Sequence, residues 1–308
     1  MSRPGPGDDR RDPLEEGALE AEIERLVELA LQEDVGSGDW TTQWTVGREQ
    51  DADARIVAKE PLVFAGAAPA VRTFEKVGGT LDVELPVPEG TLVDTGTTVL
   101  ELAGSARAIL TAERTALNFL GRLSGIATLT RTFVDQVSGT GARITDTRKT
   151  TPGWRRLEKE AVRIGGGTNH RMGLHDMVLV KDNHIAACGG VRAAADRVAQ
   201  ENRAGLPVEV EVVDMGQLEE LQGAAVQRIL LDNMDPDLLE EAVRRVASWP
   251  APRPELEASG NMTLQRVRRV AETGVDWISV GALTHSVSVA DLSLRLDAPL
   301  VPSGDFAG

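Results

Sequence analysis

The stretch VEVEVVDMGQLEELQGAAVQRILLD, residues 208–232, decides the fold because it reads as a strand, a helix and a second strand in direct succession. Residues 208–213 and 228–232 are β-type runs of Val, Ile and Leu, and residues 215–224 between them have the length of a helix. Two strands joined through a helix lie parallel in one sheet. The alternation continues on both sides, with strands predicted at 143–146, 177–180, 255–258 and 276–280 and helices at 190–203, 235–248 and 262–273.

Polar residues at the ends of these runs distinguish between the two folds that alternate in this way, a βα barrel and a doubly wound sheet. At or just beyond the predicted carboxyl ends lie Asp146, Glu211, Asp232, Ser259 and Gly281. In a βα barrel this rim is where the active site is built. We therefore predict an α/β protein with a βα barrel and a functional site on that rim.

The alternation within VEVEV predicts which side chains face the barrel interior. Glu209 and Glu211 share one face of the strand, and the three valines share the other, where they would pack on the outer helices. Buried carboxylates are costly unless cations compensate them, so either interior salt bridges or a ligand must be present. Because Glu211 lies nearer the carboxyl end, we expect it to face a ligand and Glu209 to be structural.

The chain before residue 140 has a different organisation. A helix is predicted over 19–32, β-rich segments over 54–64 and 80–102, and helical periodicity over 111–138 with a break near Gly125. We expect the domain boundary at that break. The expected organisation is a leader at 1–16, rich in charge, Pro and Gly and disordered, an N-terminal α/β domain at 17–123 and a catalytic barrel at 124–285.

Composition excludes several classes of protein. The 308 residues suggest about two domains. No apolar run is long enough to cross a bilayer, and the amino-terminal leader lacks the apolar core of a signal peptide, so we expect a cytoplasmic protein. The single cysteine, Cys188, excludes an internal disulfide and any multi-thiolate metal site. A net charge of −15 argues against binding to nucleic acid or to anionic membranes.

Positive charge is concentrated in one segment. Residues 143–181 contain nine Lys and Arg against four Asp and Glu, which leaves the rest of the chain near −20. Several of these charges lie beside Gly, Thr and His at irregular spacing rather than at the i, i+4 spacing of an exposed helix. The segment therefore predicts a pocket for a small polyanion rather than a solvated face.

Two parts of this basic segment carry candidate ligand-binding groups. The loop DTRKTTPG places Arg148 and Lys149 directly after a strand, where Arg can grip a carboxylate or phosphate in bidentate fashion. Residues 165–185 contain three of the four histidines together with Arg171 and Lys181. A zinc site is disfavoured, since His170 and His175 are five residues apart and we expect no second type of ligand to cluster nearby. No serine or cysteine nucleophile motif occurs.

The loops after the last two strands are rich in glycine. EASGNM (257–262) and SVGALTHS (279–286) each lead into a predicted helix, and such loops bind phosphate through backbone N–H groups. An ordinary turn is an equally good interpretation of either loop alone, but less so of both together. On the residues alone we predict a barrel that binds a phosphorylated polyanion, with Glu211 and Asp232 placed for hydroxyls or Mg²⁺.

Taken together and in this order, these segments resemble the quinolinate phosphoribosyltransferase family, the decarboxylating enzymes of NAD biosynthesis. Departures are small, such as Glu160, at a position where we expect an aromatic residue in many relatives. The resemblance covers most of the chain and is carried by EDVGSGD (33–39), ERTALNFLGRLSGIAT (113–128), DTRKTTPGWRRLEKEAV (146–162), GGGTNHRMGLHDMVLVKDNH (165–184), VEVEV (208–212), LLDNM (230–234), EASGN (257–261), ISVGALTHS (278–286) and DLSL (291–294).

The resemblance implies a homodimer in which an N-terminal α/β sandwich domain, joined by the C-terminal segment 286–300, caps the incomplete, TIM-like barrel of its partner. It implies a pentosyltransferase that uses Mg²⁺ to convert quinolinate and 5-phosphoribosyl 1-pyrophosphate into nicotinate mononucleotide, pyrophosphate and CO₂. The quinolinate-binding residues it implies are Arg148, His170, Arg171 and Lys181, with Arg114 from the neighbouring subunit. The residues it implies for phosphoribosyl pyrophosphate are Thr147, Lys149, Glu211, Asp232, Ser259, Gly260, Asn261, Val280, Gly281 and Ala282, of which Lys149, Glu211 and Asp232 are catalytic.

Two alternatives stay open at this point. A paralogue on the same scaffold could act on another pyridine or pyrrole-type acid, although the retained arginines argue against it. A sensor of phosphorylated metabolites that lost turnover would be expected to lack Lys149 or one of the acids, and all of them are present.

Overall fold

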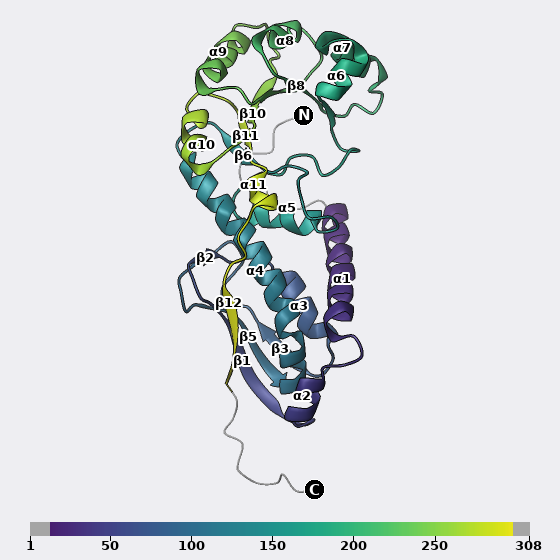
Figure 1. Ribbon diagram of the computed structural model, residues 1–308, viewed down its shortest axis with the longest axis vertical. Coiled ribbons are helices and arrows are strands. Elements are labelled where there is room, and N and C mark those ends of the chain that lie inside the picture. The colour runs from purple at the N-terminus through teal and green to yellow at the C-terminus, as the bar shows by residue number, and fades with distance from the viewer. Residues whose placement is uncertain (1–12, 298–308) are drawn as a thin grey trace. The chain divides into compact units, whose positions relative to one another are not determined.

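The computed structural model describes residues 13–297, and these fall into two compact units (Figure 1). Unit 1 holds the described residues up to Ser124 and from Val289 onward, and unit 2 holds Gly125–Ser288. Every helix within residues 13–297 is too short or too polar to span a bilayer. The elements of unit 1 are α1 (Pro13–Val35), α2 (Trp40–Thr45), β1 (Asp51–Ala58), β2 (Leu62–Val63), α3 (Ala67–Lys76), β3 (Leu81–Glu84), β4 (Leu92–Val93), β5 (Thr98–Ser105), the first part of α4 (Ala106–Gln136) and β12 (Leu292–Asp297).

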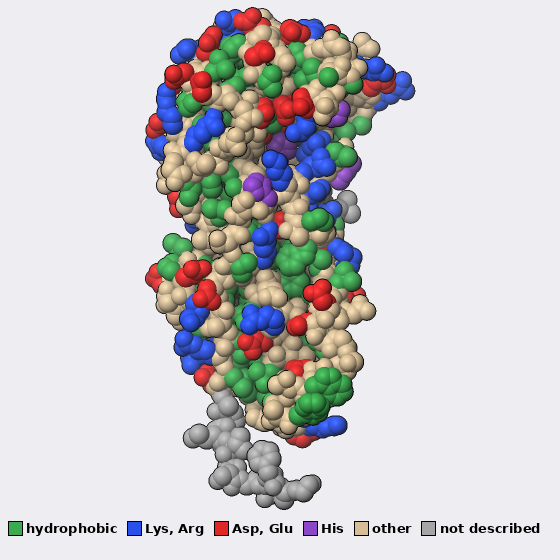
Figure 2. Space-filling view, viewed as in Figure 1, with side chains coloured by type: hydrophobic (Ala, Val, Ile, Leu, Met, Phe, Trp, Pro, Cys, Tyr) green, Lys and Arg blue, Asp and Glu red, His purple; other side chains and the backbone are tan. Residues whose placement is uncertain are grey.

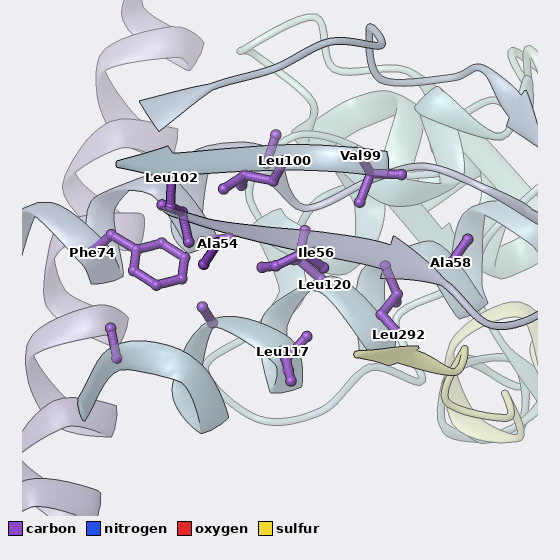
Figure 3. Close-up of a cluster of buried hydrophobic side chains, with 14 of the residues drawn as sticks. Ala54, Ile56, Ala58, Phe74, Val99, Leu100, Leu102, Leu117, Leu120 and Leu292 are labelled. Carbon is purple, nitrogen blue, oxygen red and sulfur yellow. The ribbon is translucent and has the colours of Figure 1, made fainter. Parts of the chain in front are cut away.

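The core of unit 1 lies on one face of an antiparallel sheet in the order β12-β1-β5-β3. Alternate residues of β1 are buried, and Ile56 pairs with Leu100 on one side and with Leu294 on the other. Phe74 of α3 and Leu120 of α4 belong to the same buried cluster (Figure 3). Strand β12 returns from the far end of the chain, and its antiparallel pairing with β1 completes this sheet.

Helix α4 runs without interruption through Gly125, so the predicted break near that residue is wrong. A glycine in this helix can instead serve close packing, as Gly121 does four residues earlier. A Cβ atom on Gly121 would lie 2.7 Å from Cγ1 of Val289 and 2.9 Å from the carbonyl oxygen of Ala290. A glycine that permits close packing of a helix does not need to end it.

Unit 2 is built on six parallel strands in the order β6-β11-β10-β9-β8-β7. Among the described residues, β6 and β7 are not paired with each other, so the sheet does not close on itself. The predicted parallel strands are therefore confirmed. The elements are β6 (Arg143–Thr145), α5 (Arg155–Ile164), β7 (Val178–Val180), α6 (Asp182–Cys188), α7 (Val191–Glu201), β8 (Val208–Val212), α8 (Met215–Glu220), β9 (Arg228–Asp232), α9 (Pro236–Ala247), β10 (Glu255–Ser259), α10 (Leu264–Ala271), β11 (Trp277–Ser279) and α11 (Ala282–His285).

Helix α5 corrects the interpretation of the basic segment. Arg155, Lys159 and Arg163 do follow i, i+4 spacing on this helix, so the argument from irregular spacing was wrong for these residues. The segment is nevertheless not a solvated face, because the side chain of Lys159 is fully buried. The signal for a helix was present in Leu157, Ala161 and Val162, whose side chains are buried at helical spacing.

Candidate functional site

Most predicted site residues of unit 2 lie at the carboxyl ends of its six parallel strands, and His170 and Arg171 lie in the loop between α5 and β7, just after the bridge of Thr168 to Thr145. Strands β6 and β11 are neighbours in the sheet, so the loops that follow them lie next to each other. The same holds for the loops that follow β9 and β10. On the face in view, Lys, Arg and His side chains gather on unit 2 beside a group of acidic side chains (Figure 2). The rim therefore combines a basic region with a region of acids and glycines.

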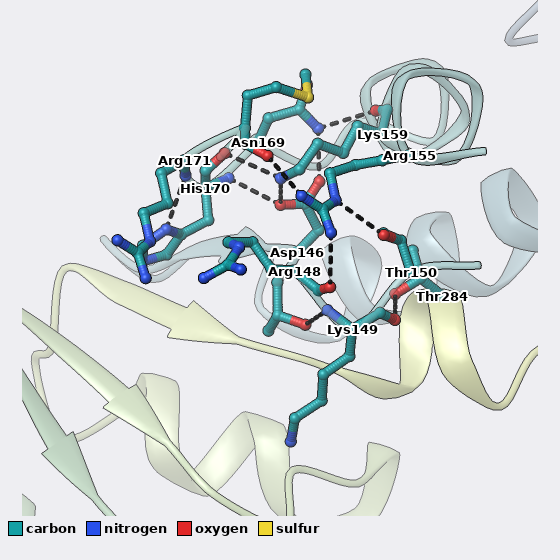
Figure 4. Close-up of polar contacts among 12 residues, drawn as sticks. Asp146, Arg148, Lys149, Thr150, Arg155, Lys159, Asn169, His170, Arg171 and Thr284 are labelled. Atoms are coloured by element: carbon teal, nitrogen blue, oxygen red, sulfur yellow. Dashed lines mark hydrogen bonds and ion pairs between the residues drawn. The ribbon is translucent and has the colours of Figure 1, made fainter. Parts of the chain in front are cut away.

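Asp146, directly after β6, organises the basic region from a fully buried position. Its carboxylate pairs with the Lys159 ammonium of α5 and accepts hydrogen bonds from the His170 N–H at 2.8 Å and from Nδ2 of Asn169 at 2.7 Å (Figure 4). Burial raises the pKa of Asp146 and lowers that of Lys159, while their mutual attraction opposes both shifts. Sequence reasoning placed Asp146 on the rim but missed this anchoring role and missed Lys159 and Asn169 altogether.

Arg155 of α5 joins the two basic loops to each other. Its Nε donates to Oγ1 of Thr150 at 2.9 Å, and its Nη1 donates to the carbonyl oxygen of Met172 at 3.1 Å. These bonds fix the loop after β6 against the loop that carries His170 and Arg171. Arg155 therefore supports the site without being one of the residues predicted to bind a ligand.

Arg148 and Arg171 place two like charges side by side. The guanidinium groups point into the same region in Figure 4, beside the His170 ring. Burial lowers the pKa of Arg171, and the neighbouring charge of Arg148 lowers it further. Arg171 donates to the carbonyl oxygen of Met177 at 3.0 Å, whereas the exposed Arg148 side chain donates no hydrogen bond to any residue in 13–297. Two converging guanidinium groups are suited to a ligand with two carboxylates.

The His170 ring lies beneath these arginines, with both nitrogen atoms in contact with protein. Nδ1 accepts the Arg171 N–H at 2.7 Å, and Nε2 lies 2.9 Å from Oε2 of Glu209 and 3.5 Å from Oε2 of Glu257. Burial lowers the pKa of His170. The expectation that no second ligand type clusters near the histidines is wrong, because the fold brings two glutamates from β8 and β10 to this ring. His175 does not belong to this group.

Glu209 and Glu257 form a buried acidic pair with one guanidinium beside it. Arg228 donates to Glu257 at 3.0 Å and stacks on the Trp277 ring at 4.3 Å from the centroid. Burial raises the pKa of each glutamate to about 7, and for Glu257 the charge of Glu209 adds to the rise. Of the two interior carboxylates of β8, Glu211 has a cationic partner from the basic segment, since Lys181 contacts it at 3.2 Å. Among the described residues Glu209 has no ion pair with a Lys or Arg, and its close contact is with the His170 ring.

Glu211 and Asp232 supply oxygen atoms on adjacent strands. Glu211 is buried near the end of β8, and half-buried Asp232 ends β9, where its Oδ2 accepts from Nδ2 of Asn233 at 2.7 Å. Carboxylate oxygens of this kind suit Mg²⁺, which also keeps water and substrate phosphate oxygens as ligands. The donor set therefore fits the metal that the resemblance implies.

The two glycine loops predicted to bind phosphate follow the adjacent strands β10 and β11. Gly260 adopts a φ of +96°, and a Cβ atom there would lie 2.1 Å from Oδ1 of Asn233. A Cβ atom on Gly281 would lie 3.3 Å from Cδ of Lys149, and Oγ1 of Thr284 donates to the Lys149 carbonyl oxygen at 2.8 Å. The fold thus brings Lys149 to one loop and the Asp232 strand end to the other.

Arg114 lies apart from these residues in the chain, on the part of α4 that belongs to unit 1. Its side chain is exposed and donates no hydrogen bond within the described residues. An arginine in this state is available to a ligand or to a second subunit.

The chain matches known protein families over most of its length. Residues 39–124 match the family described as quinolinate phosphoribosyl transferase, N-terminal domain, and residues 126–295 match the C-terminal domain of the same family. The chain belongs to the quinolinate phosphoribosyltransferase family. The resemblance inferred from the sequence motifs is therefore confirmed.

Individual relatives agree with this membership. The chain is 42% identical over 298 residues to quinolinate phosphoribosyltransferase [decarboxylating] 1b of Nicotiana tabacum, covering 91% of this chain and 83% of that protein. It is 42% identical over 273 residues to the probable nicotinate-nucleotide pyrophosphorylase [carboxylating] of Bacillus subtilis, covering 89% and 93%. The solved nicotinate-nucleotide pyrophosphorylase of Francisella tularensis superposes with a TM-score of 0.85 at 36% identity, covering 90% and 97%. This likeness confirms the fold class predicted for this chain, an α/β protein with the fold of the quinolinate phosphoribosyltransferases.

Proposed function

We propose that the rim of unit 2 transfers a phosphoribosyl group from 5-phosphoribosyl 1-pyrophosphate to quinolinate and decarboxylates the product to nicotinate mononucleotide. The observation that carries this proposal is the division of the rim into two regions. Arg148 and Arg171 converge on one side, while Lys149, the glycine loops and the carboxylates lie on the other. Such a division suits a dicarboxylate bound next to a phosphorylated sugar. Family membership supports the same reaction.

The two anionic substrates require separate positive groups. Quinolinate is a dianion, and Arg148 and Arg171 hold its carboxylates, with the His170 ring beneath them and Lys181 at the edge of the region. Lys149 and the backbone N–H groups of 259–261 and 280–282 hold the phosphates, with Thr147 beside them. The exposed Lys149 ammonium donates no hydrogen bond to the described residues, so it is available for this role.

In the transfer step the pyridine nitrogen forms a bond to ribose C1 as the bond from C1 to pyrophosphate breaks. Positive charge develops on the ribose, and the Glu211 and Asp232 carboxylates stabilise it electrostatically. Bound Mg²⁺, held by the same two residues directly or through water, would supply charge neutralisation for the departing pyrophosphate.

Decarboxylation follows because the ring nitrogen is then positive. The bond from C2 to its carboxylate breaks, CO₂ leaves, and the electron pair stays on C2, where the adjacent charge stabilises it. A proton then completes nicotinate mononucleotide, and solvent is the simplest source. Arg171 and Arg148 hold the remaining carboxylate and keep the ring in place during this step.

The complete enzyme is proposed to be a homodimer in which Arg114 of one subunit reaches the quinolinate region of the other. Its exposure and lack of hydrogen bonds among the described residues support this role. The cytoplasmic location remains a prediction, since relatives include proteins named as mitochondrial and chloroplastic.

The activity is tested with the purified full chain, quinolinate, phosphoribosyl pyrophosphate and Mg²⁺, following CO₂ and nicotinate mononucleotide, with nicotinate as the competing substrate. We expect equal amounts of both products from quinolinate and little from nicotinate. Arg171→Ala should raise the KM for quinolinate at least tenfold and leave the KM for phosphoribosyl pyrophosphate nearly unchanged, because it removes a charged hydrogen-bonding group. Binding of phosphoribosyl pyrophosphate without turnover would instead identify a sensor or a paralogue with another acceptor.

A further inference from the structure

The buried glutamates beneath His170 have no role in the proposed reaction. Glu209 and Glu257 are fully buried, and no described residue donates a well-aligned hydrogen bond to either oxygen of Glu209 or to Oε1 of Glu257. Buried carboxylates in this condition are costly, so their retention calls for a physical explanation. The contact with the His170 ring provides one.

The hydrogen bond at Nδ1 fixes the tautomer of His170. Nδ1 accepts the Arg171 N–H at 2.7 Å and therefore carries a lone pair. A neutral imidazole has one N–H group, which must then be at Nε2. Nε2 lies 2.9 Å from Oε2 of Glu209, off the line of a straight hydrogen bond. A lone pair on Nε2 would be repelled by that carboxylate oxygen, whereas an N–H group there is attracted to it.

We propose that Glu209 is a positioning residue that holds His170 as the neutral Nε2–H tautomer, so that Nδ1 is kept as the acceptor for the Arg171 N–H. Arg171 and the loop before it are thereby held for the carboxylate of the substrate. Glu257, fixed by Arg228, lies 3.5 Å from the same ring nitrogen and comes from the next-but-one strand. This inference rests on the proposed function, because it takes Arg171 as a quinolinate-binding residue.

The surroundings of the ring agree with a neutral histidine. The charged and titratable groups that act on it are Glu209 of β8, Glu257 of β10, Arg228 of β9, Lys159 of α5 and Asp146 after β6. The main chain of His170 is also fixed, since its N–H donates to Asp146 and its carbonyl oxygen accepts from Lys159 at 2.9 Å. Burial lowers the pKa of the ring, in the direction that keeps it neutral.

A divalent cation at the same three side chains is the rival explanation. His170, Glu209 and Glu257 offer ligand atoms within 4.8 Å of one another. A metal on Nε2 would require the ring proton on Nδ1, where it would face the Arg171 N–H at a donor-to-donor distance of 2.7 Å. The two donors would repel, so the geometry favours a proton at Nε2 over a metal.

The tautomer is tested on the full chain labelled with ¹⁵N-histidine, with the His170 signals assigned by their loss in His170→Asn. We expect a pyridine-type Nδ1 and a pyrrole-type Nε2, both unchanged on addition of Mg²⁺ or Zn²⁺. A protonated Nδ1, alone or together with Nε2, would overturn the proposal. This readout does not depend on turnover, so it stands even if quinolinate proves not to be the substrate.

Kinetics of matched variants test the positioning role. Glu209→Leu removes the acceptor and should raise the KM for quinolinate about tenfold, with the KM for phosphoribosyl pyrophosphate unchanged within twofold. Glu209→Gln keeps an acceptor oxygen and should remain close to wild type. Glu219→Leu, on α8 in an exposed pair with Arg245, serves as the control and should change neither value. An unchanged KM for quinolinate in a folded Glu209→Leu protein would contradict the proposal. If Glu209→Leu does not fold, the tautomer measured in the wild-type chain decides whether the proposal holds.

Discussion

At the scale of single residues, burial changes the chemistry of acids whose sequence context looks ordinary. Glu257 lies in the middle of β10 in the motif EASGN, which the sequence suggested only as the approach to a phosphate loop. Its side chain has no exposed surface, and burial together with the charge of Glu209 raises its pKa from 4.5 to about 7. The carboxyl group is thus poised to titrate near neutral pH.

This shift predicts a pH dependence of the free energy of unfolding. A carboxyl whose folded pKa is raised stabilises the fold fully below its unfolded pKa, and that contribution is lost as pH rises through the folded pKa. Between about pH 4.5 and 7 the loss from Glu257 is on the order of 3 kcal/mol. We expect the free energy of unfolding, measured with urea, to fall less between these pH values in Glu257→Gln than in the wild-type protein. Equal slopes in the two proteins would show that burial of Glu257 does not govern this dependence.

At the scale of secondary-structure elements, α5 and β6 are joined by the buried pair of Lys159 and Asp146. Removing one partner leaves an uncompensated charge in the interior, so Lys159→Met should lower the free energy of unfolding by about 3–5 kcal/mol. Arg163→Met, on the same helix but in an exposed pair with Glu160, should cost less than about 1 kcal/mol. Urea unfolding measures both, and a similar cost for the two variants would refute the distinction.

Helix α4 provides a second prediction at this scale. Replacing a helical glycine by alanine normally stabilises a helix by about 1 kcal/mol. At Gly121 the sign should reverse, because the added Cβ would collide with Val289 and with the main chain of Ala290, at a cost of about 1–3 kcal/mol. Gly17→Ala in α1, where nothing lies within 4 Å of the added atom, is the matched control and should be neutral or stabilising. Thermal unfolding distinguishes the two signs.

At the scale of the whole molecule, the proposed homodimer predicts complementation between inactive variants. Arg114→Ala and Lys149→Ala alter residues of unit 1 and unit 2, respectively, and each should be nearly inactive alone. If Arg114 acts across the interface, a hybrid dimer has one site with both lesions and one site with none. Random mixing after subunit exchange should then restore roughly a quarter of wild-type activity. No recovery in a sample that contains verified hybrids would place Arg114 in its own subunit's site.

The sequence also predicted much of the organisation at this scale. The alternation of β-type runs and helices in 143–280 predicted the parallel strands, since a strand period of two and a helix period near 3.6 are both written locally in the chain. Polar residues at strand ends predicted the rim, because the carboxyl ends of parallel strands lie on one side. The family motifs predicted the reaction class, which family membership confirms.

Other features were decided only by the tertiary structure. His170, Glu209 and Glu257 come from segments far apart in the chain, and their contact depends on how β8 and β10 are placed in one sheet. Lys159 reads as one more positive charge in the sequence, yet its burial against Asp146 makes it an internal anchor. Local periodicity determines which elements form and which faces they bury. Whether a charge is solvated, paired or unpaired depends on the dielectric and the neighbours that only the assembled fold supplies.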